Sequence, residues 1–294
     1  MIPNSDQVRQ AGFGSKLLSH RLRGFAPREH ARSAFDRLSA YPIPYVEVDT
    51  RAAADGTLFL WHGPYVADER GRQRRIASTS GRDIQAFGDS EVGLVPLDTA
   101  LSLFRRHAPA GQILCLDIKD YGFEAQHLAL LRRHDLEERA ILVSWIPQCI
   151  DALSRLGTRC PLFLSYLDLT ALGWVGRSAA NALAGALCRA GRFVLIGRDR
   201  AHDDLGQMRH GFQHGLVACG LDDRLVTALR ASGGGVCVPT YLAGRKLLRQ
   251  FHRQELRVAV FNTYSAADYR WWAAQDEVDI VFSDNAPTVC RNLE

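Results

Sequence analysis

Lysine is scarce in this sequence, and long apolar runs are missing from it. Only Lys16, Lys119 and Lys246 occur among 36 basic residues, and with 32 acidic residues the formal net charge is +4. This small excess is too weak to indicate a nucleic-acid-binding protein, although it suits a small anionic substrate. No stretch reaches about 18 consecutive apolar residues, so we expect no membrane span.

Paired cysteines and a secretory leader are missing as well. The seven cysteines are an odd number, lie far apart and form no C-x-x-C motif. Most lie in apolar runs such as ILCLDIK (113–119), where a reduced cysteine behaves as a small core residue. The N-terminal segment MIPNSDQVRQAGFGSK contains no apolar stretch of the kind that secretory signals have. We therefore expect a cytoplasmic protein; the sequence leaves its oligomeric state open.

Short apolar runs alternate with longer stretches of helical spacing. The runs occupy residues 16–20, 45–50, 113–119, 141–145, 161–167, 235–240, 258–263 and 278–284. Helical spacing is found at 28–39, 97–107, 122–134, 147–156, 244–254 and 265–275. Continuous apolar strands are typical of parallel sheets that are buried on both faces. The pattern predicts an α/β fold, a (β/α)8 TIM barrel that forms a single domain over residues 1–294.

Two segments depart from this alternation. Residues 58–62 follow the turn dipeptide Asp55-Gly56, which predicts a hairpin-like return after the second strand. Residues 171–232 are too long for one crossover and contain another apolar run, FVLIG (193–197). We interpret 171–232 as an elaborated, mainly helical connection. In the alternative, FVLIG is a barrel strand and one of the eight other runs is not.

Ionisable residues gather at the ends of the early strands. Glu47 and Asp49 are two residues apart, so both side chains leave the same face of a strand, with their Cα atoms about 6.5 Å apart. Asp117 and Lys119 repeat this spacing on the next strand. Three further residues lie at strand ends: His20, Arg21 and His62. Barrel enzymes place their active sites at the C-terminal ends of their strands.

Each of these residues also has a purely structural interpretation. A carboxylate at a strand end often caps a loop, Asp117 and Lys119 can form one structural ion pair, and a single histidine is most often a hydrogen-bonded structural residue. Together, however, three carboxylates, two histidines, a lysine and an arginine would be costly to bury without a ligand. The set as a whole therefore indicates a functional site.

The order of short motifs along most of the chain resembles the glycerophosphodiester phosphodiesterase family, a TIM-barrel group of phospholipase-C-like phosphodiesterases. The matching segments are His20-Arg21 for H-R-G, Pro27-Arg28-Glu29-His30 for P-E-N-T, Glu47-Val48-Asp49 for E-x-D, His62 for H-D, Asp117-Ile118-Lys119 for E-x-K, Phe261-Asn262-Thr263 for W-T-V-N and residues 279–287 for D-G-I-x-T-D-x-P. Four positions depart from the family: the glycine of H-R-G is displaced to Gly24, Gly63 replaces an aspartate, Asp117 a glutamate and Phe261 a tryptophan.

The resemblance implies a metal-dependent phosphodiesterase. Its substrate would be a small glycerophosphodiester-like or sugar phosphodiester, hydrolysed to a phosphomonoester and an alcohol. Hard carboxylate ligands favour Mg²⁺ or Ca²⁺, which Glu47, Asp49 and Asp117 would hold. The phosphate would bind to Arg21, or to the neighbouring Arg23, and to Lys119. Two histidines would act as general base and general acid: His20 and His62.

Three alternatives remain at this point. A phospholipase-D-like lyase or phosphotransferase would use the same residues and release a cyclic phosphate. A glycosidase would use two of the carboxylates, although this interpretation leaves His20, Arg21 and Lys119 unexplained. The third alternative is a non-catalytic phosphate-ester binding protein, which Gly63 favours because the family has an aspartate after the histidine.

Overall fold

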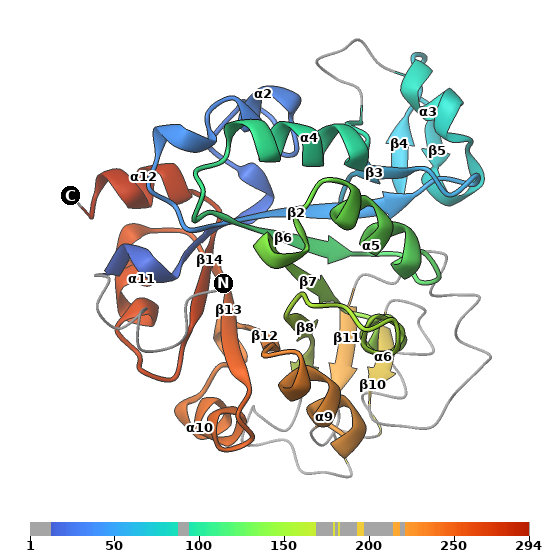
Figure 1. Ribbon diagram of the computed structural model, residues 1–294. Coiled ribbons are helices and arrows are strands. Elements are labelled where there is room, and N and C mark those ends of the chain that lie inside the picture. Colours follow the sequence, from blue (N-terminus) through green and yellow to red (C-terminus); the bar gives the residue numbers. More distant parts are fainter. Residues whose placement is uncertain are drawn as a thin grey trace.

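Eight parallel strands close into a barrel in the computed structural model (Figure 1). The structure describes residues 14–87, 94–166 and 221–293, with residues 179 and 182 and the backbone of 13, 167–168, 193–196 and 214–217. The barrel strands are β1 (Leu17–Ser19), β2 (Tyr45–Ala52), β6 (Ile113–Ile118), β7 (Ala140–Ser144), β8 (Leu162–Ser165), β12 (Gly235–Pro239), β13 (Arg257–Thr263) and β14 (Ile280–Ser283). They follow one another in chain order around the barrel, and β1 closes it by pairing with both β14 and β2. The predicted (β/α)8 barrel is therefore confirmed.

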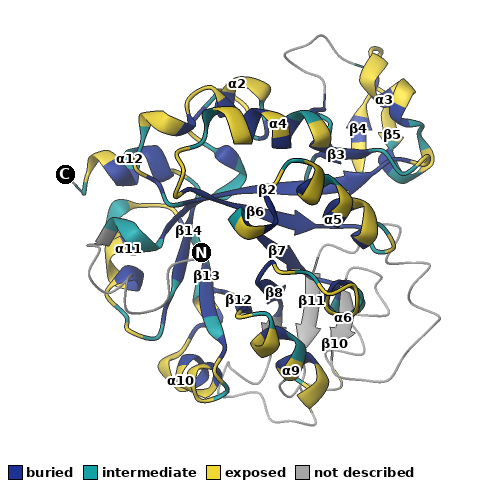
Figure 2. Ribbon diagram, viewed as in Figure 1, coloured by how far each residue is buried: buried dark blue, intermediate teal, exposed yellow. Residues whose placement is uncertain are grey.

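Helices cover the outside of the barrel. They are α2 (Arg32–Phe35), α4 (Leu97–His107), α5 (Glu124–Arg133), α6 (Pro147–Arg155), α9 (Asp223–Ala231), α10 (Arg245–Arg253), α11 (Ala266–Ala273) and α12 (Ala286–Arg291). On α4, the residues Leu97, Ala100, Leu101 and Phe104 are buried, at the spacing of one helix face. Figure 2 shows the same division throughout, with buried strands inside and exposed residues on the outer sides of the helices.

The barrel interior holds its own apolar core, separate from the layer between strands and helices. It consists of buried side chains from all eight strands: Leu18, Tyr45, Ile113, Cys115, Ile141, Val143, Phe163, Cys237, Ala259, Ile280 and Phe282. Cys115 belongs to this core, as expected for a reduced cysteine in an apolar run. The interior is thus packed with side chains and is no pore, and polar groups can gather only where the strands end.

A small subdomain follows β2. β3 (Leu58–Leu60) pairs antiparallel with β2, which confirms the predicted hairpin, and Gly56 has the positive φ of 83° that its turn requires. The next elements are the hairpin β4 (Tyr65–Ala67) and β5 (Gln73–Arg75) and the helix α3 (Gly81–Ala86). In Figure 1 these elements lie beyond the C-terminal end of β2, together with β3.

The connection after β8 contains strands that lie outside the barrel. β10 (Phe193–Ile196), which contains most of FVLIG, pairs with β11 (His214–Val217), and β11 pairs with β9 (Leu167–Asp168). FVLIG is therefore no barrel strand. The prediction that 171–232 is mainly helical misses the strand at 214–217; α9 lies at the end of the segment, and most of the segment is outside the described residues.

The predicted helix over 28–39 is wrong in extent. Only Arg32–Phe35 is α-helical, because His30 has a positive φ of 57° and Ala31 is extended. Short 3₁₀ helices complete the description: Phe13–Lys16, His20–Leu22, Leu38–Ala40, Ile76–Ser78, Glu137–Arg139 and Thr240–Leu242. Within the described ranges, the helices are all too short or too polar to cross a bilayer.

Candidate active site

A cavity of about 120 Å³ opens at the C-terminal ends of the barrel strands. Twelve described residues line it: His20, Arg21, Glu47, His62, Asp117, Lys119, Val143, Trp145, Ser165, Phe261, Asn262 and Phe282. Six of the seven predicted site residues are in this set. The seventh, Asp49, contacts two of the lining side chains. The chain therefore brings all seven predicted residues together, although they come from segments about a hundred residues apart.

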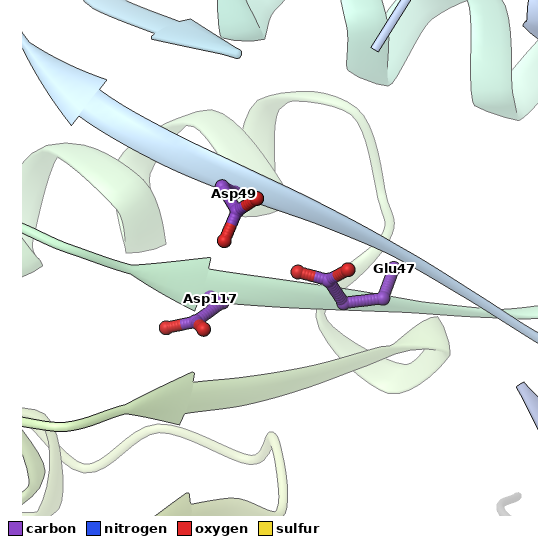
Figure 3. Close-up of side chains that lie close together, drawn as sticks. All are labelled: Glu47, Asp49 and Asp117. Carbon is purple, nitrogen blue, oxygen red and sulfur yellow. The ribbon is translucent and has the colours of Figure 1, made fainter. Parts of the chain in front are cut away.

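The three carboxylates converge because of strand register. Glu47 and Asp49 lie on the same face of β2, and Asp49 is the register partner of Asp117 on β6. One oxygen of each carboxylate lies within 4.8 Å of the others, and all three residues are buried. Figure 3 shows the side chains of both strands pointing into one space.

Two cations neutralise part of this charge. Lys119 Nζ lies 2.8 Å from Asp49 Oδ1 and 2.5 Å from Asp117 Oδ2, so the ion pair considered from the sequence exists and is shared with a second aspartate. Arg21 Nε lies 3.1 Å from Asp49 Oδ2, and the backbone N–H of Arg21 donates to Glu47 Oε2 at 2.8 Å. Each carboxylate oxygen of Asp49 is thus paired with a cation, and these two ion pairs hold Lys119 and Arg21 beside the cavity.

The pKa values of the three carboxyl groups are displaced in different directions. Burial, followed by repulsion from Asp49 and Asp117, raises the pKa of Glu47 well above its ordinary value. Burial also raises the pKa of Asp117, despite Lys119. For Asp49, the attraction of Lys119 and the contact with His30 outweigh burial and lower the pKa well below its ordinary value. Glu47 and Asp117 therefore bind a proton more readily than an ordinary carboxyl group does.

The carboxylate cluster fits a divalent cation. Asp117 Oδ1 is buried and has no hydrogen-bond partner among the described residues, which is costly unless a ligand satisfies it. The three residues offer only oxygen donors, the kind that Mg²⁺ and Ca²⁺ bind. The residues that could hold the ion are those predicted from the sequence: Glu47, Asp49 and Asp117.

His20 is oriented by an aspartate that sequence reasoning did not assign. Its Nδ1 lies 2.5 Å from Oδ1 of Asp284, which directly follows β14. A carboxylate in this position accepts the Nδ1 proton, and the unprotonated Nε2 then lies 3.9 Å from Glu47 Oε2. Burial lowers the pKa of His20, and the hydrogen bond to Asp284 partly offsets this effect. Asp284 is the second aspartate of the motif at 279–287, which is the signal that could have identified it.

His62 reaches the cavity from the segment after β3. Burial, followed by repulsion from Lys119, lowers its pKa to about 2, so its imidazole is neutral at ordinary pH. Its backbone carbonyl accepts two hydrogen bonds from Arg51, whose role is considered below.

The segment around residues 23–30 supports the site from behind. Arg23 pairs with Glu29 at 2.9 Å and with Asp284 at 2.8 Å, and it is not among the lining residues. Of the two arginines considered for the phosphate, Arg21 is therefore the one that faces the cavity. His30, buried beside β2, accepts a hydrogen bond from the backbone N–H of Asp49 at 3.1 Å.

The opposite wall of the cavity carries no charge. The ring of Phe261 meets Trp145 edge-to-face at 5.7 Å and Phe282 at 6.2 Å between centroids. Phe282 in turn packs against the ring of His20 at 5.9 Å. Ser165 and Asn262 supply the polar groups of this wall among the described residues. Of these aromatic residues, the sequence singles out only Phe261, as the counterpart of a tryptophan in a family motif, and predicts no place in the cavity wall for it.

No family model matches this chain, and no curated protein does. Solved structures match it over nearly its whole length. A glycerophosphodiester phosphodiesterase from Parabacteroides distasonis superposes with a TM-score of 0.62 at 11% identity, covering 95% of this chain and 97% of that one. A phosphodiesterase from Oleispira antarctica, in complex with the product sn-glycerol-3-phosphate, gives 0.60 at 14% identity, with 95% and 96% covered. A glycerophosphodiester phosphodiesterase from Thermotoga maritima gives 0.59 at 16% identity, with 95% and 98% covered. The chain thus has the barrel fold of the glycerophosphodiester phosphodiesterase structures, which confirms the fold that its sequence motifs implied.

Proposed function

We propose that this protein is a metal-dependent phosphodiesterase. Its substrate would be a small glycerophosphodiester-like or sugar phosphodiester, cleaved to a phosphomonoester and an alcohol. One observation carries the proposal: three buried carboxylates, two cations and two histidines meet at one small cavity. The resemblance of the fold to phosphodiesterases, one of them bound to a phosphomonoester product, supports the same reaction.

The basic residues would bind the phosphate. Arg21 offers a planar guanidinium that can contact two oxygens, whereas Lys119 offers a compact point charge. Both residues face the cavity and are already held in place by Asp49. A divalent cation held by Glu47, Asp49 and Asp117 would supply further positive charge to the phosphoryl oxygens. Since Lys119 lies between two carboxylates, we expect Lys119→Arg to disturb the site despite its conserved charge.

The two histidines would move the protons. His20 is the better base, because Asp284 on Nδ1 leaves Nε2 free to take a proton and stabilises the resulting imidazolium. His62 would donate a proton to the leaving alcohol. It is neutral in the free protein, but a phosphate bound to Arg21 and Lys119 would offset two of the charges that lower its pKa.

The compartment proposed for this chemistry is the cytoplasm. Five described cysteines are buried thiols in the barrel or its helical layer: Cys115, Cys149, Cys160, Cys237 and Cys290. Their reduced state agrees with a reducing compartment.

The test is a panel of phosphodiesters assayed with the metal-free protein. After EDTA treatment, Mg²⁺, Ca²⁺ or Mn²⁺ would be restored separately, and products would be followed by phosphorus NMR. We expect turnover only with metal and a phosphomonoester as the product. A cyclic phosphate would instead support the lyase. Full activity in EDTA would refute the role of the carboxylate cluster, and phosphodiester binding without turnover would favour the binding protein.

A further inference from the structure

A buried arginine extends the row of charged residues on β2. Glu47, Asp49 and Arg51 follow one another at period two, so their side chains leave the same face of the strand. Arg51 is only 2% exposed. It is not among the residues that line the cavity, and nothing in the proposed mechanism requires it to touch the substrate. The reason for burying a guanidinium at this position must therefore lie in its contacts.

These contacts connect the two candidate catalytic segments. Nε and Nη2 of Arg51 both donate to the backbone carbonyl of His62, at 3.1 and 2.9 Å. Nη1 donates to the backbone carbonyl of Lys119 at 3.3 Å. One side chain thus holds the carbonyls of a residue after β3 and of a residue after β6.

Asp120 makes this buried cation tolerable. Its Oδ1 accepts from Nη1 of Arg51 at 2.8 Å, and its Oδ2 accepts from the backbone N–H of Ala52 at 2.9 Å. The carboxylate is therefore anchored to β2 itself, and it fixes the guanidinium plane on the strand that also carries the metal-ligand candidates. A buried ion pair is rarely retained for its stabilising effect alone, since an apolar pair of similar volume is often as stable.

We propose that Arg51, oriented by Asp120, is a positioning residue that sets the placement of His62 relative to Lys119. This inference rests on the proposed function, because it concerns the distance between a proton donor and a phosphate-binding cation. The planar guanidinium is suited to the task, since its donors have fixed directions and two of them converge on one carbonyl. Without it, the hydrogen bond from the Trp61 N–H to the carbonyl of Asp49 at 3.0 Å would still tie the segment to β2, but the carbonyl of His62 would lose both of its Arg51 donors.

The test compares variants that separate geometry, charge and fold. Arg51→Met removes the donors but leaves the Asp120 carboxylate buried without its partner. If that unpaired charge prevents folding, the double variant Arg51→Met/Asp120→Asn serves instead, because it removes the charge as well. Arg51→Lys keeps the charge beside His62 but cannot reach both carbonyls. Arg139→Met is the matched control, because Arg139 donates to the carbonyls of Pro109 and Gln112 at the other end of the barrel.

The first readout is steady-state kinetics on the best phosphodiester of the panel. We expect all three Arg51 variants to lose kcat by about 10- to 100-fold with little change in KM, since a displacement near 1 Å has this order of effect. Arg139→Met should change thermal stability without changing kcat. Wild-type kcat in Arg51→Lys would overturn the proposal, because charge alone would then suffice.

The second readout does not depend on turnover. Imidazole nitrogen NMR resolves individual histidines, and the His62 signals can be assigned with a His62→Gln variant. We expect these signals to shift or broaden in every Arg51 variant and to stay unchanged in Arg139→Met. If no substrate is ever turned over, the proposed function fails while this measurement still decides the positioning role. Unchanged His62 signals in the folded double variant would refute it.

Discussion

The two halves of the cavity wall differ in chemistry. The half built after β1, β2, β3 and β6 carries all the ionisable lining residues, whereas the half from β7, β8, β13 and β14 carries aromatic, aliphatic and neutral polar groups. In the proposed reaction, the charged groups would act on the phosphate, whose chemistry is the same in every phosphodiester. The uncharged half would face the groups attached to the phosphate. If the proposal holds, reaction and recognition are divided between the two sides of one barrel.

The two halves of the wall are not independent, because residues of the uncharged side contact a residue of the charged side. Asp284, which follows β14, holds His20 from the uncharged side, and Phe282 on the same strand packs against the His20 ring. The uncharged half therefore also orients the base of the charged half. Substitutions in the two halves should separate these contributions.

A large loss is expected for Asp117→Asn in the charged half. The amide keeps the shape of the side chain but removes a negative ligand, so we expect kcat/KM to fall by about 10³-fold, or about 4 kcal/mol of transition-state stabilisation. Calorimetric Mg²⁺ titration of the protein should show weakened binding. Asp98→Asn, on the exposed face of α4, is the control. Near-normal activity and metal affinity in Asp117→Asn would remove this residue from the metal site.

The next test asks how far the uncharged side assists the base. His20→Ala should lower kcat by about 10²–10⁴-fold if proton transfer limits the reaction. Asp284→Asn leaves the imidazole in place and should cost less, because only its orientation and basicity change. Kinetics of both variants and of the double variant would measure this coupling. If the loss of activation free energy in the double variant equals the sum of the losses in the two single variants, the two residues act independently.

The residues of the charged half were easier to predict from the sequence than those of the uncharged half. Glu47, Asp49, Asp117 and Lys119 were predictable because charged residues at period two inside apolar strands have few purely structural uses. Trp145 was not, because an aromatic residue after an apolar run has the same pattern whether it fills a core or lines a cavity. Phe261 was matched to a family motif, but the motif alone did not predict its place in the cavity wall. Arg51 continues the period-two row of β2 and Asp284 lies in the motif at 279–287, so the sequence held a signal for both. Spacing does not reveal that Arg51 and Asp120 contact the segments of His62 and Lys119, because these segments are distant in the chain.

A smaller effect is expected in the uncharged half. Trp145→Ala removes the ring that packs on Phe261, and we expect KM to rise about tenfold, corresponding to about 1.4 kcal/mol, with kcat little changed. The loss should vary between phosphodiesters with different alcohols. Trp271→Ala controls for general effects, since Trp271 is exposed on α11. A uniform loss of kcat across the panel would break the proposed division of labour.

The smallest effect on activity is expected at His127, which lies behind the charged half and does not line the cavity. Its Nδ1 donates to the carbonyl of Phe123 at 2.8 Å, so its Nε2 accepts from the hydroxyl of Thr50 at 2.9 Å. Burial lowers its pKa to about 4, although the hydrogen bond to Phe123 partly offsets this effect, so the ring is neutral at ordinary pH. The unfolded chain, in which the pKa is near 6.5, therefore binds a proton that the folded protein does not bind between these pH values.

The free energy of unfolding should consequently fall as the pH drops from about 6.5 to about 4, by about 3 kcal/mol from this residue alone. Urea denaturation at several pH values gives the free energy of unfolding of the wild type and of His127→Gln. The contribution of His127 is the difference between the two plots of this free energy against pH. The variant should be less stable at neutral pH and flatter in its response to acid, with kcat unchanged where both proteins are folded. Parallel pH profiles of stability would show that His127 is not the titrating group. A change in kcat would show that His127 influences the reaction although its side chain does not face the cavity.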